Sequence, residues 1–279
     1  MTVEQRIREA ELSPAERRIA EEVLANPQTV AFGTVAALAD VTGTSGATVV
    51  RLATKLGYEG FPGLQADVRA ELADRLGPPA HRIATAQDGD LVTRMLGQEV
   101  ANLETTLRSL DRAEFSSVVT LLADLKRKVV VVPGDCARGV GRQLVDQLFA
   151  LRPGVSLVDA NPLGVGRELA AVERGDVVIA VGYNRYDRTV LMAADVAVEA
   201  AATVVALTDN RLGPLAKRAR HVFMVSTLGV GPFDSQVATH VVGSALVAGV
   251  ADKLRAQAGA RLHRAEDMWQ RMNALEVFR

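Results

Sequence analysis

Residues 34–58 read TVAALADVTGTSGATVVRLATKLGY, and this stretch decides the fold of the first part of the chain. Apolar side chains at helical spacing predict a helix over residues 34–41. Gly43 then supplies a turn, and Ser45 is a residue type that caps the amino ends of helices, so a second helix is expected over residues 45–56. The stretch therefore predicts two short helices joined by a four-residue turn.

The second of these helices has a polar face. Thr48, Arg51 and Lys55 follow one another at spacings of three and four residues, with Ser45 beside them. The remaining positions are apolar and are expected to pack on the preceding helices: Val49, Val50, Leu52, Ala53 and Leu56. Hydroxyl groups suit bases or phosphates, an Arg suits the edge of a guanine, and a Lys at the helix end suits a phosphate. A helix-turn-helix places such a helix in the major groove, so Ser45, Thr48, Arg51 and Lys55 are the candidate DNA-binding residues.

The charge distribution supports this interpretation only locally. The whole chain has a formal net charge of −1, and its first 80 residues hold eight Arg and Lys against eleven Asp and Glu, which is −3. Residues 41–58 nevertheless contain Arg51 and Lys55 and no carboxylate. The alternative is an ordinary helical bundle whose polar face is simply hydrated, since spacing alone does not prove DNA binding.

Further helices are expected on both sides of this stretch. Ser13-Pro14-Ala15-Glu16 has the pattern of a capping box with Pro at the first helical position, and Asn26-Pro27 is expected to end that helix. Phe61-Pro62-Gly63 begins another helix, which we expect to reach Leu76. The Gly- and Pro-containing stretch that follows predicts a linker over residues 78–89. We therefore expect an all-α domain over residues 1–77 and a second domain over residues 90–279.

The second half of the chain changes its hydrophobic period. Short apolar runs alternate with longer helical patterns, which is typical of a parallel sheet covered by helices on both faces. The expected strands are Val129–Val132, Val155–Val158, Asp176–Val181, Thr203–Thr208 and Val222–Val225. The expected helices are Met95–Leu110, Arg112–Asp124, Gly139–Leu151, Ser235–Gln257 and Arg261–Leu275. The predicted fold class is thus an α/β domain following an all-α domain.

Composition excludes several classes of protein. With 279 residues, 48% apolar, 23% charged and 4% aromatic, the chain can form two cores and is neither a disordered tail nor a small disulfide scaffold. Cys136 stands alone, and the four histidines have no metal-ligand spacing, so no metal or other cofactor is expected. No apolar run reaches the roughly 18 residues of a membrane span, and the charged amino end lacks the apolar core of a signal peptide. We expect a cytoplasmic protein without a membrane partner.

The N-terminal residues resemble a known family. The chain carries a serine, an Ala-Thr-Val-Val-Arg run and a Lys-Leu-Gly-aromatic-x-Gly-Phe run, at Ser45, Ala47–Arg51, Lys55–Tyr58, Gly60 and Phe61. In this pattern residues 1–77 resemble the DNA-binding domain of the RpiR/MurR family of bacterial transcription regulators. The resemblance implies sequence-specific binding to a duplex operator, with the second helix of the pair as the recognition helix.

Residues 90–250 resemble the sugar isomerase (SIS) domain that the same family carries. The resemblance implies a phosphate site in the loops at the carboxyl ends of the strands, but two loops depart from the family pattern. The first loop, usually glycine, any residue, glycine, serine, reads Pro133-Gly134-Asp135-Cys136-Ala137-Arg138. The second, usually rich in serine and threonine, reads Gly182-Tyr183-Asn184-Arg185-Tyr186-Asp187. Arginines, including Arg188, stand where hydroxyl groups are expected.

Two interpretations of these loops remain open. In one, guanidinium groups replace the hydroxyls and the site binds a small anionic effector. The candidate effector-binding residues are Cys136, Ala137, Arg138, Tyr183, Asn184, Arg185, Asp187 and Arg188. In the other, the site has decayed and the domain only dimerises.

The sequence as a whole predicts a transcription regulator that is a homodimer or a tetramer. Pairing of two half-sites is the usual way in which a small helix-turn-helix domain gains specificity. The rival is a sugar-phosphate isomerase with an added helical domain, but the loop motifs hold no convincing acid and base pair. A ligand-free scaffold is the third possibility. We therefore do not expect an enzyme.

Overall fold

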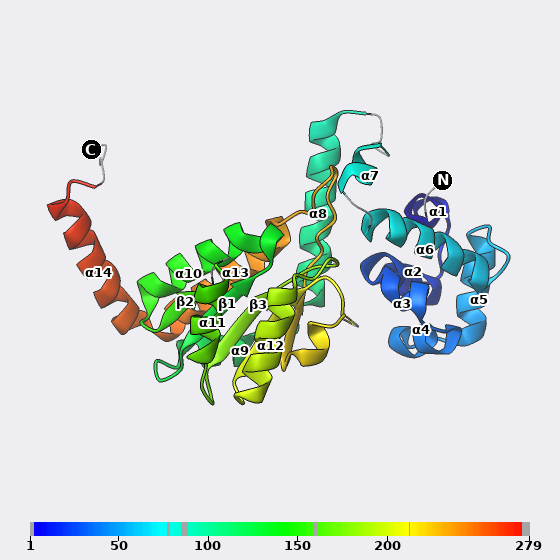
Figure 1. Ribbon diagram of the computed structural model, residues 1–279. Helices are drawn as coiled ribbons and strands as arrows, with labels where there is room; N and C mark the ends of the chain where they lie inside the picture. The colour runs from blue at the N-terminus through cyan, green and yellow to red at the C-terminus, as the bar shows by residue number, and fades with distance from the viewer. Residues whose placement is uncertain (1–2, 77–78, 85–88, 159–160, 212, 275–279) are drawn as a thin grey trace. The chain divides into compact units, whose positions relative to one another are not determined.

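The computed structural model describes residues 3–76, 79–84, 89–158, 161–211 and 213–274, which form two compact units (Figure 1). The first unit comprises residues up to Asp90 together with Val230–Phe233. The second begins at Leu91 and contains the rest of the chain. Each unit has its own buried core.

The described part of the first unit is helical. Its helices are α1 (Val3–Glu9), α2 (Pro14–Ala25), α3 (Pro27–Phe32), α4 (Val35–Thr42), α5 (Gly46–Lys55), α6 (Phe61–Leu76) and α7 (Pro79–Ala84). The predicted capping box at the start of α2 is confirmed, because Ser13 and Glu16 exchange backbone-to-side-chain hydrogen bonds of 2.9 and 3.4 Å. Helices α2, α4, α5 and α6 pack together in one core, to which each contributes a fully buried side chain: Ile19, Leu38, Leu52 and Leu64.

Three of these helices, α1, α3 and α7, were not predicted individually from the sequence. Pro27 ends α2 as predicted, but it also begins α3, because Pro is well suited to the first turn of a helix where no amide hydrogen is needed. Within the stretch predicted as a linker, Pro79 begins the short helix α7 in the same way. The segment predicted as a linker over residues 78–89 therefore contains a helix at residues 79–84.

The second unit is built on a five-stranded parallel sheet, as predicted. Its strands are β1 (Val129–Pro133), β2 (Val155–Leu157), β3 (Val177–Val181), β4 (Thr203–Thr208) and β5 (His221–Met224). They lie in the order β2-β1-β3-β4-β5 and every neighbouring pair is parallel. All five residues of β3 are buried, which explains why this strand reads as a continuous apolar run rather than an alternating one.

Helices cover both faces of the sheet (Figure 1). The helices of the unit are α8 (Leu91–Ser109), α9 (Arg112–Ala123), α10 (Arg138–Leu151), α11 (Pro162–Ala170), α12 (Arg188–Glu199), α13 (Val237–Lys253) and α14 (Arg255–Arg271). Side chains of α9, α10 and α13 share one core with the sheet, and those of α11 and α12 share the other. The carboxyl ends of the strands lead into the loops that carry the candidate effector residues.

The last two helices differ from the sequence prediction. A helix expected over Ser235–Gln257 breaks at Leu254, where α13 and α14 meet at a bend of 105°. Leu254 and Ala258 are both buried in the same core as α13, so tertiary packing favours the bend. The expected end at Leu275 lies outside the described residues. Among the described helices none is by itself long and apolar enough to cross a membrane; only the bent pair α13–α14 meets those criteria of length and composition.

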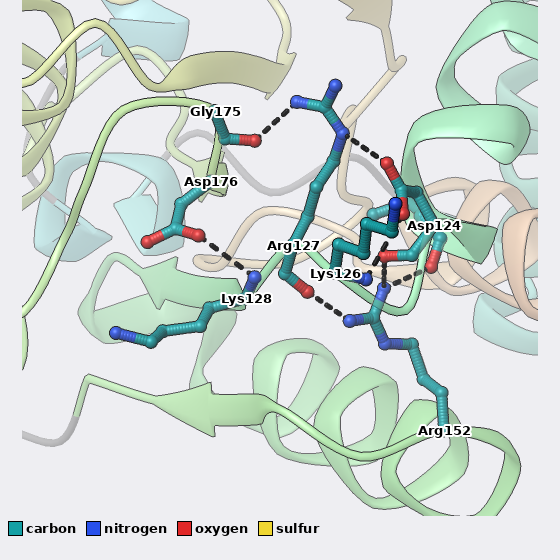
Figure 2. Close-up of polar contacts among 8 residues, drawn as sticks. Asp124, Lys126, Arg127, Lys128, Arg152, Gly175 and Asp176 are labelled. Carbon is teal, nitrogen blue, oxygen red and sulfur yellow. Dashed lines mark hydrogen bonds and ion pairs between the residues drawn. The ribbon is translucent and has the colours of Figure 1, made fainter.

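A polar cluster ties together the amino ends of the central strands (Figure 2). The fully buried Arg152 guanidinium donates hydrogen bonds to the carbonyl oxygens of Asp124 and Arg127. Arg127 Nε bonds the Asp124 carboxylate at 2.9 Å, and Asp176 accepts from the Lys128 amide at 2.9 Å. Buried polar groups need such partners, so this end of the sheet is held by internal contacts.

Candidate DNA-binding helix and candidate effector site

The turn between α4 and α5 follows the predicted chemistry. Gly43 adopts φ 59°, a left-handed conformation that favours glycine, and its amide bonds the carbonyl oxygens at the end of α4. Ser45 caps α5, since its Oγ accepts a hydrogen bond from the Thr48 amide at 3.3 Å. Arg18 on α2 donates to the Thr42 carbonyl at 3.2 Å and so holds the turn against the neighbouring helix.

Ser45, Thr48 and Arg51 form a chain of contacts at the start of α5. The two hydroxyl oxygens of Ser45 and Thr48 lie 2.9 Å apart, and Arg51 Nη2 donates to Thr48 Oγ1 at 3.2 Å. Ser45 and Arg51 are exposed, whereas Thr48 is only 8% exposed. The Thr48 hydroxyl therefore orients Arg51 and contacts the Ser45 cap, and Thr48 does not have the open position that helical spacing had predicted for it.

Lys55 at the end of α5 is held by an ion pair across the unit. Its Nζ lies 3.0 Å from Glu16 Oε2, on the first turn of α2. The Ser13 amide and then Lys55 lower the pKa of Glu16 to about 2, so this carboxylate stays charged and keeps its hold on the ammonium. Lys55 remains 41% exposed, which leaves it within reach of a phosphate that would compete with Glu16.

The exposed face of α5 agrees only in part with the face that the sequence predicted. Val50, expected to be packed, is 41% exposed, while Val49, Leu52 and Ala53 are completely buried. Ala47, Val50, Arg51 and Thr54 are all exposed and follow one another at i, i+3, i+4 and i+7. Helical spacing counted from Arg51 could have predicted this face. The apolar side chain of Val50 was instead expected to be buried.

The first loop of the candidate effector site is a single helical turn, Asp135–Ala137, between β1 and α10. Ala137 is fully buried in the core, so its side chain is not available to a ligand. Cys136 and Arg138 are exposed, and Arg138 lies 3.0 Å from Asp135 of the same loop. Loss of solvent around the sulfur and the charge of Asp234 raise the pKa of the Cys136 thiol, which keeps it protonated.

Two tyrosines fill the base of the second loop, which follows β3. Tyr183 is 2% exposed, and its hydroxyl bonds Thr239 Oγ1 at 2.8 Å and Gln236 Oε1 at 3.0 Å. The Tyr186 hydroxyl bonds Thr208 Oγ1 at 2.9 Å and lies so close to Gly213 that a Cβ there would come within 2.3 Å of it. Tyr183 thus serves as an internal support rather than as an open contact.

The remaining residues of this loop differ in their solvent exposure and in their hydrogen bonds. Asp187 caps α12, because its Oδ1 accepts a hydrogen bond from the Thr189 amide at 2.8 Å. Arg185 and Arg188 are exposed on either side of it. The two loops are neighbours, since the Gly134 amide donates to the Val181 carbonyl at 2.8 Å. Arg138 pairs with Asp135 within its own loop.

Asp209 is a candidate site residue that sequence reasoning missed. It follows β4 at the carboxyl edge of the sheet, and Oδ1 accepts from the Asn184 amide at 3.0 Å while Thr227 Oγ1 lies 3.3 Å from Oδ2. Burial, with a smaller contribution from Asp234, raises the pKa of Asp209 to about 7. Its place directly after the strand was a signal in the sequence, but its burial was not. Among the described residues, no group of three His, Cys, Asp or Glu side chains could hold a metal ion.

Comparison with known proteins identifies both halves. Residues 1–75 match the model of the helix-turn-helix domain of the rpiR family, and residues 139–249 match that of the SIS domain. The chain belongs to the RpiR family of transcriptional regulators. The helix-turn-helix implies DNA binding, and the curated relatives that this RpiR-family chain matches are transcriptional regulators rather than enzymes.

Individual relatives agree with this assignment. The chain is 28% identical over 219 residues to the Escherichia coli regulator YfhH, an uncharacterized protein, with 75% of this chain and 76% of YfhH covered. It is 26% identical to the sugar isomerase domain of an RpiR transcription factor from Sphaerobacter thermophilus, with a TM-score of 0.61 over 64% of this chain and 99% of that domain. The Vibrio vulnificus NanR protein complexed with ManNAc-6P shares the fold at 22% identity and a TM-score of 0.59, covering 97% of this chain and 99% of NanR.

Proposed function

We propose that this RpiR-family regulator reads duplex DNA with α5 as its recognition helix. The observation that carries the proposal is the exposed Arg51, oriented by Thr48 beside the Ser45 cap. No carboxylate lies within residues 41–58, so nothing in this stretch repels the phosphate backbone. Lys55 would take a phosphate at the other end of α5 by exchanging its Glu16 partner for the DNA. Such a protein works in the cytoplasm, where the bacterial chromosome lies.

The test of this proposal is operator binding by the full chain, measured by fluorescence anisotropy on DNA selected from a random pool. Arg51→Ala is expected to cost about 1–3 kcal/mol on the selected sequence and little on unrelated DNA. Lys55→Ala is expected to weaken binding to all sequences alike and to lower the salt slope by about 1. Unchanged binding by both folded variants contradicts the assignment of α5.

We also propose that residues 90–279 pair two copies of the chain, so that the two DNA-binding domains of residues 1–77 engage two half-sites. Symmetric operators and symmetric dimers go together in helix-turn-helix proteins. Sedimentation of the full chain is expected to show a dimer or a tetramer at concentrations where the operator is bound. A monomer that binds the operator with full affinity contradicts this proposal.

The SIS domain is proposed to take a small anionic effector at the carboxyl edge of its sheet. NanR is complexed with the sugar phosphate ManNAc-6P, and in this chain Arg185 and Arg188 are exposed in the loop that follows β3. Asn184 and Asp187 belong to the same loop, and Asp209 accepts a hydrogen bond from the Asn184 amide. These polar groups suit the hydroxyl groups of a sugar. Of the other candidates, Cys136 and Arg138 are exposed in the first loop, whereas Ala137 and Tyr183 are buried and support the two loops.

A ligand-free dimerisation domain is the second candidate, and the tyrosines favour it. Tyr183 and Tyr186 are bonded to Thr239 and Thr208, so side chains of the protein occupy space in the second loop. A thermal-shift screen of sugar phosphates, nucleotides and carboxylic acids separates the two candidates. A ligand at a hundred times its dissociation constant stabilises the folded state by about 2.7 kcal/mol. Hits that vanish in the Arg185→Ala, Arg188→Ala double variant support the effector site, and the absence of anionic hits supports the scaffold.

A further inference from the structure

The outward face of α5 is apolar at its centre. Val50 is 41% exposed, and it lies between Ala47 and Thr54, which are exposed as well. The positions i, i+3 and i+7 place these three side chains on one stripe, with Arg51 along its edge. A stripe of methyl-bearing side chains thus occupies the part of α5 that the proposed function directs into the major groove.

Val50 does not contribute to the core of its own unit. Val49 and Leu52 are completely buried and supply the contacts that hold α5 against the neighbouring helices. An exposed β-branched residue in the middle of a helix has a lower helix propensity than Ala, so neither folding nor helix formation explains a valine at this position. The side chain is therefore available for a partner.

The polar groups beside Val50 narrow the chemistry of that partner. The Thr54 hydroxyl donates to the Val50 carbonyl at 3.1 Å, which satisfies it within the helix. Arg51 supplies a positive charge beside Val50, which suits a nucleic acid and opposes a purely apolar protein groove. In the major groove of DNA, the one apolar group on a base-pair edge is the 5-methyl group of thymine.

We propose that Val50, together with Ala47, is a specificity-determining residue that contacts the 5-methyl group of thymine in the operator. The inference rests on the proposed function of α5 as a recognition helix. Because Arg51 follows Val50 directly, the thymine is expected next to the guanine that Arg51 contacts. Removing the 5-methyl group of that thymine, which the contact buries, is expected to weaken binding of the protein to the operator about fourfold. This factor corresponds to the transfer of one methylene-sized group out of water.

The test uses the full chain and the operator selected from random DNA. Each thymine of that operator is replaced in turn by deoxyuridine, which lacks only the 5-methyl group, and affinity is measured by fluorescence anisotropy. The wild-type protein is expected to lose about fourfold at one thymine per half-site. Val50→Ala is expected to bind the thymine and deoxyuridine forms equally well.

Matched variants keep this result interpretable. Val41 on α4 is 63% exposed, and Val41→Ala is expected to keep the full sensitivity to deoxyuridine. Arg51→Ala is expected to keep it as well while losing affinity for guanine. If a specific operator is selected but no thymine is sensitive, or if Val50→Ala stays as sensitive as the wild type, the inference is overturned and the function of α5 stands. A loss of self-association in Val50→Ala also overturns it, in favour of a protein interface. If no sequence is selected at all, the proposed function falls and the inference with it.

Discussion

The amino ends of α5 and α12 are capped in the same way by groups of different charge. The Ser45 hydroxyl accepts the Thr48 amide in the first unit, and the Asp187 carboxylate accepts the Thr189 amide in the second. Both caps satisfy an amide that the helix leaves unpaired. A hydroxyl leaves the partial positive charge of the helix end available to an anion, whereas a carboxylate neutralises it.

The surroundings of the two caps enlarge this difference. No carboxylate lies in the sequence within residues 41–58 around the Ser45 cap. Near Asp187 the carboxyl edge of the sheet carries the buried Asp209 and the exposed Asp135. The comparison teaches that the first unit leaves the positive end of α5 without a neutralising carboxylate, whereas the second unit neutralises the end of α12 and leaves arginine side chains as the available positive charges.

The largest predicted effect is on the free energy of unfolding, and it comes from Asp209 at the carboxyl edge of the sheet. Because the pKa of Asp209 is raised to about 7, the folded protein keeps a proton that the unfolded chain releases near pH 4. The free energy of unfolding therefore falls as the pH rises from about 4 to about 7, by roughly 3 kcal/mol from this group. Asp209→Asn is expected to remove that fall, because Asn accepts the same Asn184 amide without a charge.

Chemical denaturation of both proteins at pH 5 and at pH 8 measures this prediction. The stability of the wild type relative to Asp209→Asn is expected to drop between the two conditions. Asp252→Asn, at an exposed carboxylate on α13, is the control and is expected to follow the wild type. Parallel pH profiles for the wild type and Asp209→Asn contradict the prediction.

The next largest effect is expected on operator affinity, when the neutral cap of α5 is replaced by a charged one. Ser45→Asp keeps a capping oxygen for the Thr48 amide, so α5 is expected to remain folded. The added carboxylate repels the phosphates that the helix end would meet, and operator affinity is expected to fall about 100-fold, or about 2.7 kcal/mol. Fluorescence anisotropy measures the loss, and Ser45→Thr, a neutral cap, is the control. Equal binding by Ser45→Asp and Ser45→Thr shows that this helix end does not face DNA.

A smaller effect is expected from the converse change in the second unit. Asp187→Asn retains the cap on α12 and removes its negative charge. Binding of inorganic phosphate, measured by calorimetry, is expected to become about three- to tenfold tighter, since the helix end no longer opposes an anion. Asp135→Asn, on the exposed ion pair with Arg138, serves as the comparison. If phosphate affinity rises only in the latter, the first loop rather than the end of α12 is the anion site.

The smallest effect is expected on DNA affinity, when Lys55 is released from its ion pair. Glu16→Gln removes the ion pair but keeps an acceptor for the Ser13 amide, so the capping box survives. Since exposed ion pairs contribute up to about 1 kcal/mol, the released Lys55 is expected to tighten binding to all DNA sequences two- to threefold. Titrations at several salt concentrations measure it. Weaker binding by this variant means that Glu16 positions Lys55 instead of competing with the DNA.

Local patterns predicted most of the fold correctly. The capping box at Ser13, the turn at Gly43 and the valine run of β1 are decided by residues close together in the sequence, and each lies where it was expected. The prediction was wrong where packing decides. The break at Leu254 depends on the core that α13 and α14 share.

The candidate sites divide in the same way. The residue types at Ser45 and Arg51, and their order along the chain, determined by themselves that one helix carries a neutral cap beside a cation. Asp187 was expected only as an effector-binding residue, and the structure shows it as the cap of α12. Only the tertiary structure decided that Thr48 is covered, that Val50 is open and that Lys55 meets Glu16, 39 residues away. It also decided the raised pKa of Asp209. The physical reason is that solvent exposure and charge pairing depend on which helices and strands meet, and those contacts join segments that are distant in the sequence.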